Sequence, residues 1–375
     1  ETGETRWLGA EGVDEYAGEF SKSGEWLVTI RNRDAALMPV LYRVETGEAR
    51  QLNLPPGIAL GSSFVLGDRK LLVQHSASNR RPELLLYDLA TDTHETLLEA
   101  EYGSIDPALF VTGEHIRYPS SDGRPVPAIL YRPRDIAPGE RLPALVVVHG
   151  GPTAQWFLNF DPYAQFLTDR GFVVLEPNVR GSTGYGVEWR DLNIKDWGGG
   201  DLEDVAAGAA YLKSLPYVDP ERVGVFGGSF GGFMSYIAVV KKPDVFKVGV
   251  PWIGITDLHK LYDEDMEHFR YYFRQQMGDP EADRALWRDR SAIEFADRLK
   301  AKLLIIHGVN DPRCPVSQSR IFRERILDLG KREGTGPDDD FEYHEFGDEG
   351  HGPSGDIQGK IRTYRLLVDF LERRL

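Results

Sequence analysis

One segment limits the possible fold of this chain more than any other. A short apolar run, Val223–Phe226, leads into the sequence Gly227-Gly228-Ser229-Phe230-Gly231-Gly232, and an apolar helical stretch follows. Glycines on either side of Ser229 allow backbone segments to approach closely around a sharp turn. A buried strand, a turn that carries a serine and then a helix are typical of a parallel sheet wrapped by helices, in which the serine hydroxyl is exposed.

Short, continuous apolar runs recur through the rest of this region, as expected for strands buried on both faces. They are 144–148, 173–175, 223–226, 248–250 and 303–306, with helical stretches between them and a final amphipathic helix at about 359–375. Such alternation predicts a doubly wound, mostly parallel sheet with helices on both sides. We therefore expect an α/β domain over residues 113–375.

The first part of the chain differs, because it contains a repeat. The segment 1–8 returns as 45–52, and the segment that opens at Phe20 returns at Phe64, in both cases 44 residues later. Short apolar strands at this period predict β-propeller blades. We assign residues 1–112 to the last strand of one blade and two further blades. A propeller closes with about four to eight blades, so we expect upstream blades that this sequence does not contain.

Asp311 and His351 are candidates for the catalytic acid and base. Both follow Ser229 in the chain, in the expected order. In the α/β-hydrolase fold the order is nucleophile, acid, histidine. Asp311 follows the predicted strand that ends at His307, and His351 lies between glycines in a later loop, whereas His344 lies within a predicted strand. The imidazole of His351 would take the proton of Ser229, and Asp311 would orient that imidazole. The sequence therefore predicts the triad Ser229, Asp311 and His351.

Two backbone amides are candidates for an oxyanion hole. The turn His149-Gly150-Gly151-Pro152 follows an early strand, where such a turn offers an N–H to a tetrahedral intermediate beside the N–H that follows the nucleophile. We expect these donors to be Gly151 and Phe230.

The composition limits the kinds of partner that this chain can be expected to bind. The net charge is −15, from 44 basic and 59 acidic residues, which argues against a nucleic-acid or anionic-membrane partner. No apolar run is long enough to span a membrane.

The single cysteine, Cys314, suits a reducing compartment, so we expect a cytoplasmic protein. We find no metal-ligand spacing or nucleotide loop, and expect no metal and no cofactor.

Six motifs in order resemble the prolyl oligopeptidase family of serine peptidases, in particular its acylaminoacyl-peptidase-like branch. They are HGGP at 149–152, RGSTGYG at 180–186, GDLED at 200–204, GGSFGG at 227–232, HGVNDPRCP at 307–315 and DEGHG at 348–352. The resemblance covers the whole chain. It implies a peptidase that acts on short peptides, with a propeller that covers the active site and excludes folded proteins.

The resemblance also suggests substrate-binding residues. Arg270 resembles an arginine of the acylaminoacyl-peptidase branch that helps to bind substrate, although a surface helix arginine is an equal interpretation. Trp252 and Phe230 are candidates for the specificity pocket, with core packing as the alternative. The chain differs from dipeptidyl peptidases and prolyl oligopeptidase at one position. Those enzymes resemble each other in having a tyrosine in the oxyanion hole where this chain has His149.

Three functions remain open. The first is a peptidase of the acylaminoacyl or oligopeptidase type, with a dipeptidyl type or a carboxypeptidase as variants. The second is a carboxylesterase, which would use the same triad. The third is a binding protein without activity, which the intact triad disfavours. The sequence does not decide which end of a peptide is cleaved, and exposed blade edges make a homo-oligomer a further expectation.

Overall fold

The computed structural model describes residues 3, 5–352 and 355–375 and divides them into two compact units. The first unit extends to His115 and includes Gln155–Phe166 and Thr183–Val187. The second contains Ile116–Ala154, Leu167–Ser182 and Glu188–Leu375. The expected boundary between residues 112 and 113 stays a prediction. Among the described helices, none has both the length and the apolarity needed to cross a membrane.

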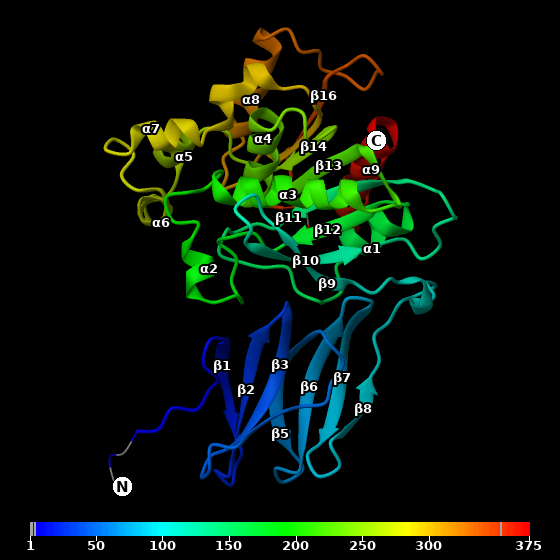
Figure 1. Cartoon of the computed structure of the whole chain (residues 1–375), viewed down its shortest axis with the longest axis vertical. Coiled ribbons are helices and arrows are strands. Elements are labelled where there is room, and N and C mark those ends of the chain that lie inside the picture. Colours follow the sequence, from blue (N-terminus) through cyan, green and yellow to red (C-terminus); the bar gives the residue numbers. More distant parts are fainter. Residues whose placement is uncertain (1–2, 4, 353–354) are drawn as a thin grey trace. The chain divides into compact units, whose positions relative to one another are not determined.

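The first unit contains two groups of antiparallel strands (blue to cyan in Figure 1). Each strand of the second group begins 44 residues after its counterpart in the first, so the repeat seen in the sequence is a repeat of whole strands. This arrangement is consistent with an incomplete β-propeller, as predicted. The first group is β1 (Asp14–Phe20), β2 (Trp26–Arg33), β3 (Ala36–Arg43) and β4 (Ala49–Gln51); the second is β5 (Ile58–Val65), β6 (Lys70–Ala77), β7 (Arg80–Asp88) and β8 (Thr93–Leu98).

The strand expected at residues 1–8 is not present in the described part of that segment. Residues 1, 2 and 4 lie outside the described residues, and residues 5–8 belong to no strand. Arg6 reaches the carbonyl of Glu45 with its side chain, at 2.6 Å. A strand needs backbone hydrogen bonds to a neighbour, and a side-chain contact of this kind does not supply them.

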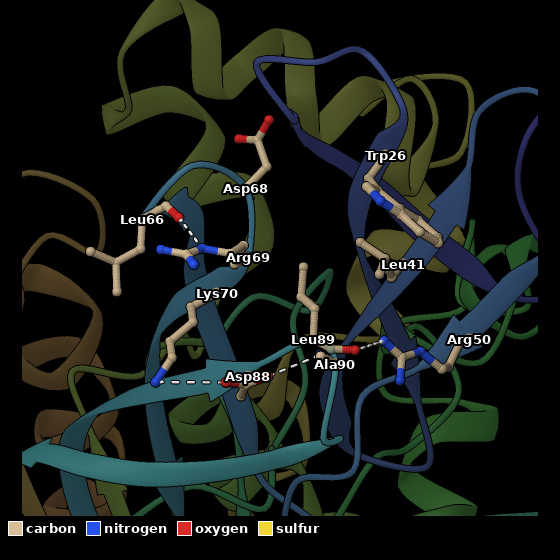
Figure 2. A pocket seen from close by; sticks show the side chains of 10 residues that line it. All are labelled: Trp26, Leu41, Arg50, Leu66, Asp68, Arg69, Lys70, Asp88, Leu89 and Ala90. Carbon is tan, nitrogen blue, oxygen red and sulfur yellow. Dashed lines mark hydrogen bonds and ion pairs between the residues drawn. The ribbon is translucent and has the colours of Figure 1, made fainter.

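The two strand groups, here called blades, share one cluster of buried apolar side chains, and both contribute to the lining of a pocket of about 490 Å³. Arg50 of the first blade forms an ion pair with Asp92 of the second, at 2.8 Å. Figure 2 shows Trp26 and Leu41 on one side of this pocket and the turn at Leu66–Lys70 on the other. The charged side chains that line this pocket are paired with other groups of the same unit, so we assign no ligand to it.

The second unit is built on one mixed sheet. The strand order is β16-β15-β14-β13-β11-β12-β10-β9, with parallel pairing from β12 through β11 to β16 and antiparallel pairing of β10 with β12. The predicted α/β-hydrolase architecture is confirmed. The strands are β9 (Glu114–Pro119), β10 (Pro125–Tyr131), β11 (Leu142–Val148), β12 (Val173–Pro177), β13 (Val218–Gly228), β14 (Val248–Trp252), β15 (Lys302–Gly308) and β16 (Phe341–Phe346).

Helices follow the strands, as the sequence pattern predicts. Helices α3 and α4 contact each other and pack against the central strands β11 and β13, most of whose residues are buried. The helices are α1 (Pro162–Asp169), α2 (Val187–Asp191), α3 (Gly200–Ser214), α4 (Phe230–Lys241), α5 (Leu258–Glu264), α6 (Glu267–Met277), α7 (Arg284–Asp289), α8 (Ser317–Asp328) and α9 (Ile357–Arg374), with short 3₁₀ turns η1 (Pro107–Leu109) and η2 (Ala292–Arg298).

Candidate active site

Ser229 occupies a strained turn between β13 and α4. Its φ of 58° and ψ of −116° lie outside the regions that L-residues normally adopt, and strain of this kind gathers at functional sites. A Cβ on Gly231 would lie 2.1 Å from the carbonyl oxygen of Val148, and one on Gly227 would lie 2.6 Å from the same atom. The turn therefore requires glycine on both sides of the serine.

The acid and histidine loops are joined by backbone hydrogen bonds at the carboxyl ends of β15 and β16. The amide of Asn310 donates to the carbonyl of Glu349 at 3.0 Å, and the amide of Val309 donates to the carbonyl of Phe346 at 2.9 Å. A Cβ on Gly308 would lie 2.3 Å from the Gly350 carbonyl oxygen. Since the two loops approach this closely, their side chains are brought together.

Asp311 and His351 form a direct pair. The Nδ1 atom of His351 lies 2.8 Å from Oδ2 and 2.9 Å from Oδ1 of Asp311. Burial raises the pKa of Asp311, but hydrogen bonds from His351 and from the amides of Cys314 and Arg313 outweigh it and leave the pKa below its ordinary value. Asp311 is therefore a carboxylate at neutral pH and orients the imidazole.

No hydrogen bond joins Ser229 to His351 among the described residues. The Ser229 hydroxyl instead interacts with the thiol of Cys314, whose pKa burial raises far above its ordinary value and a hydrogen bond with Ser229 partly lowers. Hydrogen bonds between catalytic groups are often long without substrate, so this arrangement is compatible with a resting site. No sequence pattern indicated that Cys314 would lie beside the nucleophile.

The other two histidines of this region, His307 and His344, differ in their surroundings. His307 donates from Nε2 to the carbonyl of Cys314 and accepts at Nδ1 from the Ser319 hydroxyl, both at 2.7 Å. Burial lowers its pKa, so the ring is neutral. His344 lies within β16, as predicted.

The HGGP turn lies beside Ser229. A Cβ on Gly150 would lie 3.5 Å from the Cβ of Ser229. His149 donates from Nδ1 to the Gly150 carbonyl at 2.7 Å, and its Nε2 accepts from the Ser182 hydroxyl at 2.8 Å. Burial lowers the pKa of His149 to about 4. A neutral histidine thus connects the HGGP turn to the RGSTGYG motif.

Both candidate oxyanion donors have free amides. In the described part of the chain, neither the N–H of Gly151 nor that of Phe230 donates to a protein acceptor. Phe230 is the first residue of α4, where the helix dipole also favours negative charge. The role of these two amides as an oxyanion hole stays a prediction.

The RGSTGYG and GDLED motifs meet in a buried ion pair. Nε and Nη2 of Arg180 donate to the two carboxylate oxygens of Asp204 at 2.9 and 2.6 Å, and the Arg180 amide donates to Oδ2 at 2.9 Å. The Ser120 hydroxyl adds a further hydrogen bond to Asp204, at 2.6 Å. This bidentate pair fixes the loop that carries Ser182 against the start of α3.

The two candidate substrate-binding side chains have different surroundings. Trp252 ends β14, is 7% exposed, and accepts the Ser229 amide on its carbonyl at 3.0 Å. Arg270 lies on α6, donates from Nη2 to the carbonyl of Asp263 at 2.5 Å and lies over the ring of Tyr262. Its Nε has no partner among the described groups. Roles for both in substrate binding stay predictions.

Comparison with known proteins identifies the family. The sequence profile of the prolyl oligopeptidase family matches residues 158–375, which is more than half of the chain. The chain belongs to the prolyl oligopeptidase family. The resemblance inferred from the six motifs is thereby confirmed at the level of the family.

The individual relatives and solved structures share less than a third of their residues with this chain. Dipeptidyl aminopeptidase BIII of Pseudoxanthomonas mexicana is 28% identical over 88% of this chain and 46% of its own length. A puromycin-hydrolyzing peptidase of Mycobacterium tuberculosis superposes with a TM-score of 0.85 at 26% identity, over 95% of this chain and 53% of that protein. Pyrococcus horikoshii acylaminoacyl peptidase gives 0.82 at 27% identity, over 97% and 56%. The chain thus spans about half the length of these family members.

Proposed function

We propose that this chain carries the catalytic domain of a serine peptidase that hydrolyses short peptides through an acyl-enzyme. The observation that carries the proposal is the Asp311–His351 hydrogen bond at 2.8 Å, formed at the same sheet edge as the strained serine turn. In this proposal residues 113–375 are the catalytic domain, and residues 1–112 are blades of a propeller completed by sequence outside this chain.

The proposed reaction begins with attack of the Ser229 Oγ on the carbonyl carbon of the scissile bond. The hydroxyl proton passes to Nε2 of His351, and Asp311 stabilises the imidazolium. The carbonyl oxygen becomes an oxyanion and accepts hydrogen bonds from the amides of Gly151 and Phe230. Collapse breaks the C–N bond as His351 returns the proton to the leaving amine.

Deacylation uses the same groups with water in place of the amine. His351 takes a proton from the water, the resulting hydroxide attacks the acyl carbonyl, and the C–O bond to Ser229 breaks. The serine recovers its proton from His351, and the acid product leaves. An ester would pass through the same acyl-enzyme, so a carboxylesterase remains the alternative on chemical grounds.

For specificity, we propose exopeptidase action on a blocked amino terminus, of the acylaminoacyl type. Support comes from the likeness to the Pyrococcus horikoshii acylaminoacyl peptidase and from His149 at the position where the dipeptidyl peptidases resemble each other in having tyrosine. The name of the Pseudoxanthomonas mexicana relative keeps a dipeptidyl type as the competing variant. Carboxypeptidase action is the third variant, in which Arg270 would bind a substrate carboxylate.

The compartment and the partners of the protein are part of the same proposal. The single cysteine Cys314 is buried and free, which suits a reducing compartment such as the cytoplasm. Short peptides are the proposed partners, together with the remaining propeller blades. Association of identical chains through exposed blade edges stays a prediction.

A fluorophosphonate probe tests whether Ser229 is an activated nucleophile. The wild-type chain and a Ser214→Ala control, which removes an exposed hydroxyl from the last turn of α3, should both be labelled. Ser229→Ala should not be labelled and should cleave no peptide. Labelling of Ser229→Ala at the wild-type rate would overturn the proposal.

A further inference from the structure

The loop between α2 and α3 packs an aromatic ring against the residue that follows the nucleophile. Trp197 is 1% exposed, and its ring lies edge-on to the Phe230 ring with centroids 5.2 Å apart. Phe230 is itself 1% exposed and also contacts Phe233, one turn along α4. A displacement of Trp197 would therefore leave space beside the first residue of α4.

The segment Asn193–Gly199, here called the strap, is attached at several points along its length. Asp196 accepts hydrogen bonds from the amide of Gly200 at 2.7 Å and from Nη2 of Arg290 at 2.8 Å. The amide of Lys195 donates to the carbonyl of Gln276 on α6 at 2.6 Å. These attachments come from the start of α3, from α6 and from Arg290, so the strap is held at several points.

One end of the strap is joined to a buried carboxyl group. Nδ2 of Asn193 lies 2.7 Å from Oδ2 of Asp201, which is fully buried in the first turn of α3. The Asn193 Oδ1 is buried and has no partner among the described groups. Gly181 makes room for this side chain, since a Cβ there would lie 2.8 Å from that of Asn193.

Both carboxyl oxygens of Asp201 accept hydrogen bonds from their neighbours. Nδ2 of Asn193 donates to Oδ2 and the Leu202 amide donates to Oδ1, both at 2.7 Å. These two bonds favour the charged form of Asp201, but burial outweighs them and raises the pKa of the group. A neutral carboxyl avoids an isolated buried charge, which is costly.

We propose that the strap positions Phe230 through the ring of Trp197, and that Asp201 fastens the strap in its protonated form. Trp197 and Asp201 are then positioning residues for the oxyanion hole. The inference rests on the proposed function, in which the Phe230 amide is an oxyanion donor. It adds that catalysis requires Trp197 and Asp201, which do not contact the substrate.

The charges around Asp201 explain how its ionisation would loosen the strap. Asp196 of the strap and Asp204 of α3 both disfavour a second negative charge, and burial is the largest cause that raises the Asp201 pKa, to about 8. Arg290 is paired with Asp196, and Arg180 with Asp204. Neither arginine therefore makes an ion pair with Asp201 in the described structure, and ionisation would place uncompensated charge at the end of the strap.

The test of Trp197 compares two substitutions in the 375-residue chain. Trp197→Ala should lower kcat for a peptide p-nitroanilide by about 10- to 100-fold with little change in KM, because a small displacement of a donor weakens transition-state binding. Trp197→Phe should recover most of the loss. The control is Trp287→Phe, which alters an equally buried tryptophan that contacts His259 and Tyr262 rather than Phe230, and it should keep wild-type kcat.

The test of Asp201 is the pH profile of kcat. Wild-type kcat should fall as the pH rises through about 8, whereas Asp201→Asn, which stays neutral, should lack this decline. Identical profiles, or wild-type kcat in Trp197→Ala, would overturn the strap proposal. Ser229→Ala separates the two levels: if it remains active, the proposed function fails, and if it is inactive while the strap variants match wild type, only the strap proposal fails.

Discussion

Nδ1 of His351 lies within hydrogen-bonding distance of both carboxylate oxygens of Asp311, at 2.8 and 2.9 Å. The pair joins two loops that are 40 residues apart in the sequence. Because the carboxylate also accepts two backbone amides, its position is fixed independently of the histidine. The imidazole is thus oriented by a group that is itself held rigidly.

Asp311→Asn should lower kcat by about 10³- to 10⁴-fold, since an amide no longer holds the imidazole in the tautomer that accepts the serine proton. Steady-state cleavage of a peptide p-nitroanilide measures the effect. Thermal unfolding of the same variant provides the control for folding. A loss of less than about tenfold in a folded variant would mean that Asp311 does not orient the base.

Asp204→Ala should lower the free energy of unfolding by about 3 kcal/mol, because it removes the bidentate partner of the buried Arg180 guanidinium and leaves only the contact with Asp122. Urea denaturation gives the value. Asp219→Ala removes the partner of a more exposed arginine, Arg222, and should cost much less stability, because exposed ion pairs contribute little. Equal losses in the two variants would contradict the account of the buried pair.

Asp201 should make the stability of the folded chain depend on pH. Its pKa is about 8 in the folded chain and 3.8 ordinarily, so the stability that its proton supports is complete below 3.8 and is lost as the pH rises through about 8. Each pKa unit corresponds to about 1.4 kcal/mol. Between about pH 5 and pH 8, wild type should lose roughly 3 kcal/mol more stability than Asp201→Asn in urea denaturation. The same loss in both proteins would show that Asp201 is not the group responsible.

Cys314 should react slowly with iodoacetamide despite its place beside Ser229. The thiol is 4% exposed, and burial raises its pKa, so the reactive thiolate is scarce. Mass spectrometry should find the folded chain unmodified near neutral pH and the urea-unfolded chain alkylated. Rapid alkylation of the folded chain would point to an accessible second nucleophile at the site.

The elements that the sequence predicted are those in which a local pattern has one structural solution. The turn at Ser229 needs glycines on both sides, and the repeat of 44 residues corresponds to whole strands. The approach of His351 to Asp311 could be inferred because the fold limits where an acid and a base can follow the nucleophile, and the catalytic role of the triad stays a prediction.

What the sequence did not reveal depends on contacts between distant segments. The approach of Cys314 to Ser229, the packing of Trp197 on Phe230 and the bond from His149 to Ser182 leave no periodic or motif signal. Each arises from the way that loops at one sheet edge fold over one another. The expected strand at residues 1–8 was not found in its described residues, because a repeat predicts a strand but does not supply its pairing partner.

The central claim, that Ser229 drives peptide cleavage, is tested most directly by mass spectrometry of the products from one peptide offered free, N-acetylated and C-amidated. With the Ser229→Ala chain as control, the account predicts release of the blocked amino-terminal residue from the acetylated form by wild type alone. Equal cleavage by the Ser229→Ala chain, or no cleavage of any form by wild type, would contradict it.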